Sequence, residues 1–307
     1  MPDRKPDICV LSNPKSGTAQ RNSGALDRAM AVFGARAELR SFSGDPASKA
    51  RMAVKDGFAI VVAAGGDGTV AGVAHALSGT DCALAVLPLG TFNYFARGLG
   101  MPEDPDSAAR AILGGTPHAI AVGTLNGRVF LNNVAVGLYP AILEEREATY
   151  ARYGRYRILA HIASLRTILR FQRPYRMDIL QDATRHRIRT PMVFVARSAY
   201  QLDQFGLEGG DAISDDRFAL FLAHQQTRLG FLKLAFRLLR RKVDHGRDVI
   251  VSTPRRIELS VRGRKRVPVA LDGEKLRMSL PLTIELAEEL LRVILPSDRS
   301  PDPKTPR

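Results

Sequence analysis

The sequence predicts an α/β protein: an N-terminal doubly wound α/β domain followed by a β-rich, sandwich-like domain. Over residues 7–130, short apolar runs alternate with helix-length segments, as in a parallel sheet covered on both faces. Beyond about residue 130, short strand-like runs follow one another between Gly- and Pro-marked turns, which is typical of antiparallel sheets. The length of 307 residues fits two domains.

In the first domain we expect strands at residues 8–11, 38–42, 58–63 and 83–87, and helices at 19–33, 46–56, 69–78 and 106–113. Because ligands of such sheets bind beyond the carboxyl ends of the strands, the loops after these strands are where a site is expected.

In the second domain we expect strands at residues 129–136, 176–179, 192–196, 218–222, 248–252, 256–261 and 267–271. Two basic helices interrupt them, at 150–176 and 229–242. In the second of these helices, the predicted apolar face is Leu229, Leu232, Phe236 and Leu239, beside cations that include Arg240, Arg241 and Lys242. The polar, Pro-rich residues 297–307 are expected to be a disordered tail.

The net charge of +14 is unevenly spread, with +2 in residues 1–130 and +12 in the remainder. The absence of Trp and of any zinc, RNP or helix-turn-helix pattern argues against nucleic acid as the partner of this charge. No apolar run is long enough to span a bilayer, and the N-terminus does not resemble a signal peptide. We therefore expect a cytoplasmic protein that contacts an anionic membrane surface peripherally, at the inner face of the membrane. Cys9 and Cys82 lie in apolar runs and are expected to be buried free thiols.

The loop after the third predicted strand is "GGDGTV", residues 65–70, and it leads into a helix. Three glycines in four positions let backbone N–H groups approach a ligand, and a helix N-terminus adds its dipole, so the segment favours an anion site. Asp67 would then lie beside phosphates, which makes sense mainly with a divalent cation between them. Taken alone, the motif is equally compatible with a tight turn.

Two further loops strengthen the anion-site interpretation. "SNPKSGT" (12–18) follows the first strand and "PLGTFN" (88–93) follows the fourth, so three small, polar turns are expected at one sheet edge. Together they predict a polyphosphate pocket. The sequence contains neither a Walker-type loop nor a dinucleotide G-x-G-x-x-G pattern.

The segments "NPKSG" (13–17), "GGDGT" (65–69), "PLGTFNYFARGLG" (88–100) and "LDGE" (271–274) resemble the diacylglycerol kinase catalytic-domain family, in particular the soluble bacterial lipid kinases related to diacylglycerol and sphingosine kinases. The resemblance covers about residues 7–295. It implies a phosphofructokinase/NAD-kinase-like nucleotide-binding domain at 1–130, completed by 282–296, and a lipid-binding or lid domain at 131–281.

The resemblance also implies ATP and Mg²⁺ as cofactors and carries site roles onto this sequence. It assigns nucleotide binding to Asn13, Ser41, Gly65, Gly66, Asp67, Gly68, Thr69 and Thr91. Asp272 matches the general base that must accept the proton of a lipid hydroxyl, and Glu274 matches its acidic neighbour. For Asp272-Gly273 the residues alone also fit a simple hairpin turn.

Some relatives carry a structural Mg²⁺ in a stretch that resembles "DAISDDRFAL" (211–220), which makes Asp215 a candidate ligand with the carbonyls of Ala212 and Arg217. A solvated acidic turn is the alternative. Two positions depart from the family: Tyr94 stands where an Asp is common, and Ala71-Gly72 where Asn-Glu is common.

The leading hypothesis is an ATP-dependent lipid kinase that phosphorylates a membrane lipid, with diacylglycerol as the default acceptor, giving phosphatidic acid. A sphingoid base or ceramide is an alternative acceptor. A soluble NAD-kinase-like enzyme and a non-catalytic lipid-binding pseudokinase are further alternatives. The oligomeric state is open, with a homodimer as one option.

Overall fold

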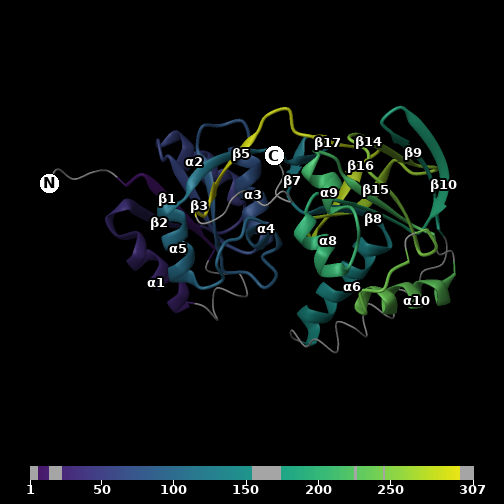
Figure 1. Cartoon of the computed structure of the whole chain (residues 1–307), viewed down its shortest axis with the longest axis horizontal. Helices are drawn as coiled ribbons and strands as arrows, with labels where there is room; N and C mark the ends of the chain where they lie inside the picture. The colour runs from purple at the N-terminus through teal and green to yellow at the C-terminus, as the bar shows by residue number, and fades with distance from the viewer. Residues whose placement is uncertain (1–5, 14–22, 154–173, 225–226, 245, 298–307) are drawn as a thin grey trace. The chain divides into compact units, whose positions relative to one another are not determined.

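The computed structural model describes residues 6–13, 23–153, 174–224, 227–244 and 246–297, and the chain divides into two compact units (Figure 1). The first unit comprises Met1–Val122 and Ala287–Arg307, and the second comprises Gly123–Leu286. Within the described residues, the strands form three six-stranded sheets.

One sheet, in the order β2-β1-β3-β4-β18-β5, forms the centre of the first unit. Its strands are parallel except for β5, which runs antiparallel to β18. Every residue of β1 and of β4 is buried, as expected when helices cover both faces of a sheet. The strands are β1 (Ile8–Ser12), β2 (Ala37–Ser41), β3 (Ile60–Gly65), β4 (Ala83–Pro88), β5 (Thr116–Ile120) and β18 (Leu291–Leu295).

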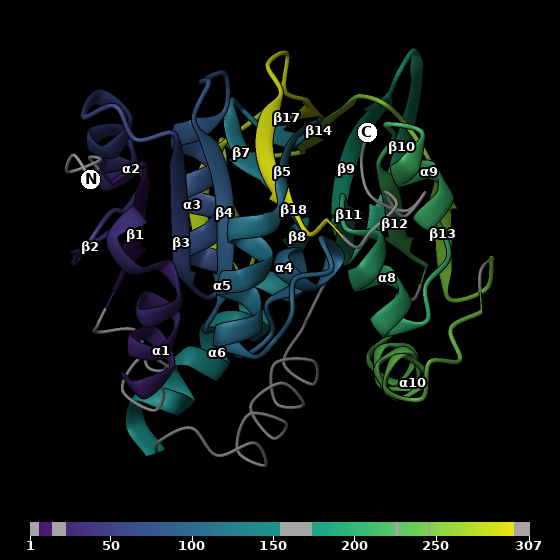
Figure 2. The ribbon, with the colours of Figure 1, turned by 60° about the vertical axis from the view of Figure 1, so that its left-hand side comes forward.

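Helices cover both faces of this sheet: α1 packs beside α5, and α2 beside α3. Figure 2 shows α1 and α5 in front of the sheet and α3 behind it. Asp45 and Asp104 cap α2 and α5, and a proline follows each of them at the first helical position. The helices are α1 (Ser23–Phe33), a 3₁₀ turn (Gly34–Arg36), α2 (Pro46–Lys55), α3 (Asp67–Leu77), α4 (Tyr94–Gly98) and α5 (Pro105–Gly114).

The second unit is a sandwich of two antiparallel sheets, ordered β10-β9-β14-β17-β6-β7 and β13-β12-β11-β8-β15-β16. Both sheets contribute to one core, in which Met177 and Ile179 of the first join Val193 and Leu220 of the second. The first sheet contains β6 (Gly123–Leu125), β7 (Arg128–Phe130), β9 (Tyr175–Gln181), β10 (Thr184–Thr190), β14 (Ile257–Val261) and β17 (Leu282–Leu286). The second contains β8 (Asn133–Gly137), β11 (Met192–Ala196), β12 (Ala219–Ala223), β13 (Val249–Ser252), β15 (Arg266–Leu271) and β16 (Glu274–Ser279). The predicted fold class is confirmed.

The outer face of the second sheet is buried as well, under helices. Along β12, Leu220 and Leu222 belong to the sandwich core, whereas Phe221 and Ala223 belong to a second core that α8 and α10 share. Within the described residues of this unit, the helices are α6 (Leu138–Tyr153), α8 (Ala199–Phe205), α9 (Gly210–Ser214) and α10 (Arg228–Leu239).

The division between the units falls at residues 122/123 and 286/287 rather than at the expected 130/131 and 281/282. The reason is strand pairing: β6 pairs with β7 and β17, and β17 also pairs with β14, so all three strands at the expected boundaries belong to the sandwich. A strand run near a boundary does not reveal by itself which sheet its partners belong to.

One helix of the second unit was not predicted, and several predicted segments lie outside the described residues. The sequence pattern did not predict α6. This helix has Pro140 in its first turn and no continuous apolar face, so it lacks the signals by which helices are predicted. The predicted basic helix at 150–176 lies mostly outside the described residues, as do residues 19–22 of the predicted first helix and 298–307 of the tail.

The structure bears on the predictions for the two cysteines and for membrane-spanning segments. Cys9 and Cys82 are confirmed as buried free thiols, and burial raises the pKa of each to about 11, so both stay protonated at neutral pH. Among the helices that the structure describes, none has the length and apolar character to cross a membrane.

Candidate active site

The strands that precede the three small, polar turns end at the same edge of the first unit's sheet, and residues 14–18 of the first turn lie outside the described residues. In the strand register, Ser12 lies opposite both Ser41 and Ala64, and Gly65 lies opposite Pro88. The residues that follow β1, β3 and β4 are therefore neighbours at the carboxyl edge, where such sheets bind ligands. Asn13 is half-buried just beyond β1, and Ser41 is exposed at the end of β2.

The loops after β3 and β4 touch through their glycines. A Cβ on Gly90 would lie 2.4 Å from the Cα of Gly66, so the backbones approach more closely than any side chain allows. The N–H of Leu89 donates to the carbonyl of Gly65 at 3.1 Å, which ties the two loops together. The result is a backbone-lined surface at the sheet edge, suited to phosphate oxygens.

The GGDG loop ends in the N-terminus of α3, which begins at Asp67. Its N-cap residue is Gly66, so no side chain caps the first turn, and Asp67, Gly68 and Thr69 are the first three helical residues. The hydroxyl of Thr69 packs back against Gly65, where an added Cβ would come within 2.8 Å. An eleven-residue helix that presents an uncapped N-terminus beside a glycine loop is a favourable anion site.

Asp67 links the GGDG loop to the helix after the GTFN loop. Its Oδ1 accepts a hydrogen bond from the backbone N–H of Phe95, in α4, at 3.2 Å. In nucleotide sites Mg²⁺ takes one or two carboxylates together with phosphate oxygens and water, so a single half-buried carboxylate at this edge fits that ion.

Asn93 of "GTFN" shapes its loop, a role that the sequence reading did not assign. The residue adopts a left-handed conformation (φ 51) and is buried. Its Oδ1 accepts from the N–H of Gly90 at 2.9 Å, and its Nδ2 donates to the carbonyls of Gly90 (3.0 Å) and Pro88 (3.3 Å). These bonds hold Gly90 against the GGDG loop and leave Thr91 exposed at the tip.

The two departures from the family pattern have visible consequences. The ring of Tyr94 stacks on that of Phe92, with centroids 5.5 Å apart, so an aromatic pair stands where an acidic group was expected. Gly72 lets α3 pack closely on α2, because a Cβ there would lie 2.4 Å from Cγ of Pro46.

Asp272 occupies the two-residue turn between β15 and β16, in the second unit. Asp272 (φ 47) and Gly273 (φ 85) both have positive φ, as in a type I′ hairpin. The Asp272 carboxylate also reaches a segment distant in sequence: Oδ1 accepts from the N–H groups of Asn132 (2.7 Å) and Asn133 (2.9 Å), and Oδ2 from that of Leu131 (2.7 Å). Three donors orient this carboxylate and favour its charged form, which is the form that a general base requires.

Glu274 lies at the start of β16 and pairs with Arg128, its Oε2 being 2.9 Å from Nη2. Both side chains are about half exposed to solvent, so the pair contributes little to stability.

The expected structural Mg²⁺ site does not fit this chain. Asp215 is exposed, the carbonyl of Ala212 already accepts the N–H groups of Asp215 and Arg217, and the carbonyl of Arg217 accepts from Arg197. No cluster of three or more His, Cys, Asp or Glu suited to a metal ion occurs in the part of the chain that the structure describes.

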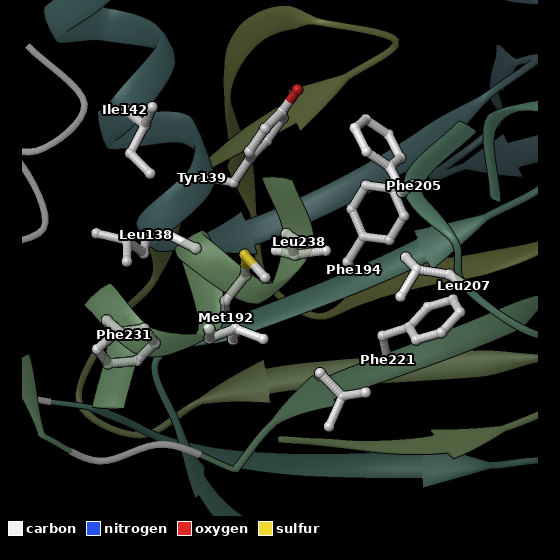
Figure 3. A pocket seen from close by; sticks show the side chains of 13 residues that line it. Leu138, Tyr139, Ile142, Met192, Phe194, Phe205, Leu207, Phe221, Phe231 and Leu238 are labelled. Atoms are coloured by element: carbon white, nitrogen blue, oxygen red, sulfur yellow. The ribbon is translucent and has the colours of Figure 1, made fainter. Parts of the chain in front are cut away.

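An apolar pocket of about 180 Å³ lies on the outer face of the second sheet, under α10. In Figure 3, Phe194, Phe205 and Phe221 gather at the right and Leu138, Ile142 and Phe231 at the left, with Met192 between them. Among the described residues, thirteen side chains line the pocket, all of them aliphatic, aromatic or thioether groups, and the hydroxyl of Tyr139 is the one polar group that these thirteen carry.

The predicted apolar face of α10 is wrong at Leu229 and Phe236 but right at Leu232, which packs against the second core. Phe231, Leu234, Ala235 and Leu238 line the pocket, whereas Leu229 and Phe236 are 71% and 52% exposed. The helix is apolar on two sides, and periodicity cannot decide which side packs inward. The helix also carries the exposed cation Lys233, and the exposed cations Arg240 and Lys242 follow its last residue. The Arg240 guanidinium lies 4.1 Å from the centre of the Phe236 ring.

Comparison with known proteins matches residues 7–125 to the family model described as "Diacylglycerol kinase catalytic domain". Residues 7–125 are therefore similar to this catalytic domain. It is 27% identical to the diacylglycerol kinase of Bacillus subtilis over 84% of each chain. It is also 46% identical to a Pseudomonas aeruginosa protein named "Probable lipid kinase YegS-like", over 44% of this chain and 45% of that one. A crystal structure of a diacylglycerol kinase from Bacillus anthracis superposes with a TM-score of 0.64 and 18% identity, covering 94% of this chain and 97% of the other, which supports the shared fold.

The diacylglycerol kinase family match bears differently on the two groups of predicted residues. The span 7–125 includes every residue predicted to bind nucleotide, from Asn13 to Thr91. Asp215, Asp272 and Glu274 lie beyond it, so their roles stay predictions.

Proposed function

We propose that this lipid kinase transfers the γ-phosphoryl group of ATP to a hydroxyl of a membrane lipid, with diacylglycerol as the first acceptor to test. The observation that carries the proposal is the contact between Gly66 and Gly90 beside the uncapped N-terminus of α3, a phosphate-binding surface within the region matched by the kinase family. A panel of diacylglycerol, sphingoid base and ceramide in mixed micelles with labelled ATP identifies the acceptor.

The proposed roles follow the chemistry of phosphoryl transfer, which depends on positioning and charge stabilisation. Backbone N–H groups of the glycine loops hold the phosphates, with Thr69, Asn13, Ser41 and Thr91 as further polar contacts. Asp67 holds Mg²⁺, which when bound neutralises charge on the phosphates. Asp272 accepts the proton of the lipid hydroxyl, and its neighbour Glu274 adds negative charge nearby.

The second unit supplies an apolar environment for a lipid chain. Moving an acyl chain out of a bilayer costs little only if the receiving surface is also apolar, and the lining of the pocket under α10 meets this condition. The outer side of α10 joins exposed Leu229 and Phe236 with cations, a combination typical of helices that lie in a membrane interface. We infer that α10 rests on an anionic bilayer and that one acyl chain enters the pocket beneath it.

Charge reversal on α10 and just after its C-terminus tests membrane contact. The triple change Lys233→Glu, Arg240→Glu and Lys242→Glu should weaken binding to vesicles with anionic lipid by at least about 100-fold, since each cation near such a surface contributes about 1 kcal/mol. Co-sedimentation with vesicles measures it. Arg241 is left intact because it packs against the end of α8 at Gly206.

The matched control makes the same charge reversal at three exposed arginines of the other sheet. Arg185 and Arg189 lie in β10, and Arg255 lies just before β14. This control should bind vesicles much more tightly than the α10 variant. Equal losses in the two variants would show a general effect of net charge and contradict docking through α10.

Filling the pocket tests the acyl-chain site. Ala235→Phe places a ring among the lining side chains and should raise the KM for lipid in mixed micelles by about tenfold, with the KM for ATP unchanged. Leu229→Phe adds bulk on the exposed side of the same helix and should leave both constants near wild type. An unchanged lipid KM in folded Ala235→Phe would place the lipid chain elsewhere.

A further inference from the structure

Arg197, directly after β11, is an arginine in the interior of the second unit. Its side chain is 1% exposed, although arginine is almost never fully buried unless paired. Burial lowers the pKa of its guanidinium from the ordinary value, and the hydrogen bond with Asp216 acts in the opposite direction. A buried cation needs oxygen partners, and the end of α9 together with the loop that leads to β12 supplies them.

Three oxygens of the 213–217 segment, which spans the end of α9 and the loop after it, accept hydrogen bonds from the guanidinium. Nη1 donates to the carbonyls of Ile213 (2.9 Å) and Arg217 (3.3 Å), and Nη2 donates to Oδ1 of Asp216 (2.7 Å). Asp216 itself has a left-handed backbone (φ 55), so the loop turns sharply around the side chain that enters it. Two carbonyls and a carboxylate converging on one positive group are also the kind of oxygens that a hard divalent cation takes.

The backbone of Arg197 connects this loop to the segment that holds Asp272. The N–H of Arg197 donates to the carbonyl of Asn132 at 2.8 Å, and the N–H of Asn132 donates to Oδ1 of Asp272 at 2.7 Å. The side chain of the neighbouring Asn133 donates to Oε1 of Gln201, in α8, at 2.9 Å. The order of the loop around Arg197 therefore bears on the position of Asp272.

We propose that the guanidinium of Arg197 is the resident cation of the 213–217 loop and takes the place of a structural divalent metal, so that the second unit folds without one. Unlike a metal, this cation is part of the chain and cannot be removed by a chelator. Its planar fork fixes the directions of the three oxygens, which a lysine ammonium does not do. The proposal does not depend on the acceptor lipid or on activity.

Thermal unfolding of the nucleotide-free protein tests the proposal directly. Excess EDTA should leave the Tm of wild type unchanged, and a return to millimolar Mg²⁺ should leave it unchanged as well. A structural metal held at about 100 times its Kd would add stability that chelation removes, lowering the Tm by roughly 5 °C or more. If EDTA lowers the Tm of wild type but not that of Asp215→Asn, the proposal is overturned. If EDTA lowers the Tm of both proteins, the metal binds away from this loop and the proposal stays supported.

Variants of Arg197 provide a second test of the proposal. Arg197→Met removes the guanidinium, so the three oxygens lose the hydrogen bonds that it donated. The Tm of this variant should be lower than that of wild type by roughly 10 °C. The matched control is Arg217→Met, in the same loop, whose guanidinium makes an exposed hydrogen bond to the carbonyl of Thr253 and should matter little. Arg197→Lys keeps the charge without the fork and should lie between the two. Equal Tm values for Arg197→Met and Arg217→Met would refute the role of Arg197.

If Arg197→Met does not accumulate as folded protein, Arg197→Lys and the EDTA experiment on wild type decide the matter. A Tm for Arg197→Lys equal to that of wild type, or a metal that co-purifies in stoichiometric amount with wild type and is lost in Asp215→Asn, would each contradict the proposal.

Discussion

Asp272→Asn should lower turnover by 10²- to 10⁴-fold, roughly the contribution of a general base, while the affinity for ATP changes by less than about twofold. An amide cannot accept the proton of the lipid hydroxyl, and ATP is expected to bind through the glycine loops of the first unit. Measurement of kcat with saturating lipid, together with ATP binding by calorimetry, tests both parts.

Asp272 also has a structural role, so the variant needs a control with the same role. The amide introduced by Asp272→Asn would turn an NH₂ or a weaker acceptor toward the N–H groups of Leu131, Asn132 and Asn133, and some stability should be lost. Asp182 is a close structural counterpart. It begins the two-residue turn between β9 and β10 with φ 50, and its Oδ1 accepts from the N–H groups of Arg255 and Arg256, both at 2.9 Å.

We expect Asp182→Asn and Asp272→Asn to lower the Tm by similar amounts, and we expect turnover to collapse only in Asp272→Asn. Turnover that survives in well-folded Asp272→Asn would show that Asp272 is purely a turn residue. If wild type binds ATP but phosphorylates no lipid, the pseudokinase alternative is favoured instead.

Gly90→Ala should weaken nucleotide binding by roughly tenfold or more and lower the Tm. The new methyl group would meet the Cα of Gly66 at 2.4 Å and Oδ1 of Asn93 at 2.5 Å, so the two loops must separate. Separation breaks up the backbone surface proposed to hold the phosphates. Titration with a fluorescent ATP analogue measures the effect.

Gly24→Ala is the matched control. Gly24 lies in α1 of the same unit, nothing lies within 4 Å of an added Cβ, and alanine favours a helix. This variant should bind nucleotide like wild type and be as stable or slightly more so. Wild-type nucleotide affinity in Gly90→Ala would argue that phosphates bind away from the paired loops.

The sheet edge proposed to bind nucleotide could be predicted because its determinants are local and periodic. Apolar runs separated by helices imply parallel strands, and parallel strands place the strand ends at Ser12, Gly65 and Pro88 at one edge of the sheet. The starts of elements were less accurate: the third strand runs over Ile60–Gly65 rather than 58–63, and α3 begins at Asp67 rather than at 69.

The second unit depends on contacts between residues far apart in the chain, which no local pattern encodes. The hydrogen bonds from Leu131–Asn133 to Asp272 span about 140 positions, and Arg197 meets its loop oxygens across 16 to 20. Beside Asp215, which the sequence suggested as a metal ligand, the neighbouring Asp216 pairs with the buried Arg197. The sequence pattern likewise placed Leu229 and Phe236, which are exposed, on the packed face of α10. That helix has apolar side chains on two sides, and only its surroundings decide which side packs.

Transfer of label from [γ-³²P]ATP to lipid by the purified wild-type protein is the most direct test of the central claim. With Mg²⁺ and diacylglycerol, sphingoid base or ceramide in mixed micelles, one lipid should acquire label in proportion to enzyme and time, and Asp272→Asn should transfer almost none. Label that appears in no lipid, or in NAD when it is supplied as a soluble acceptor, would contradict the assignment of this chain as a kinase of membrane lipids.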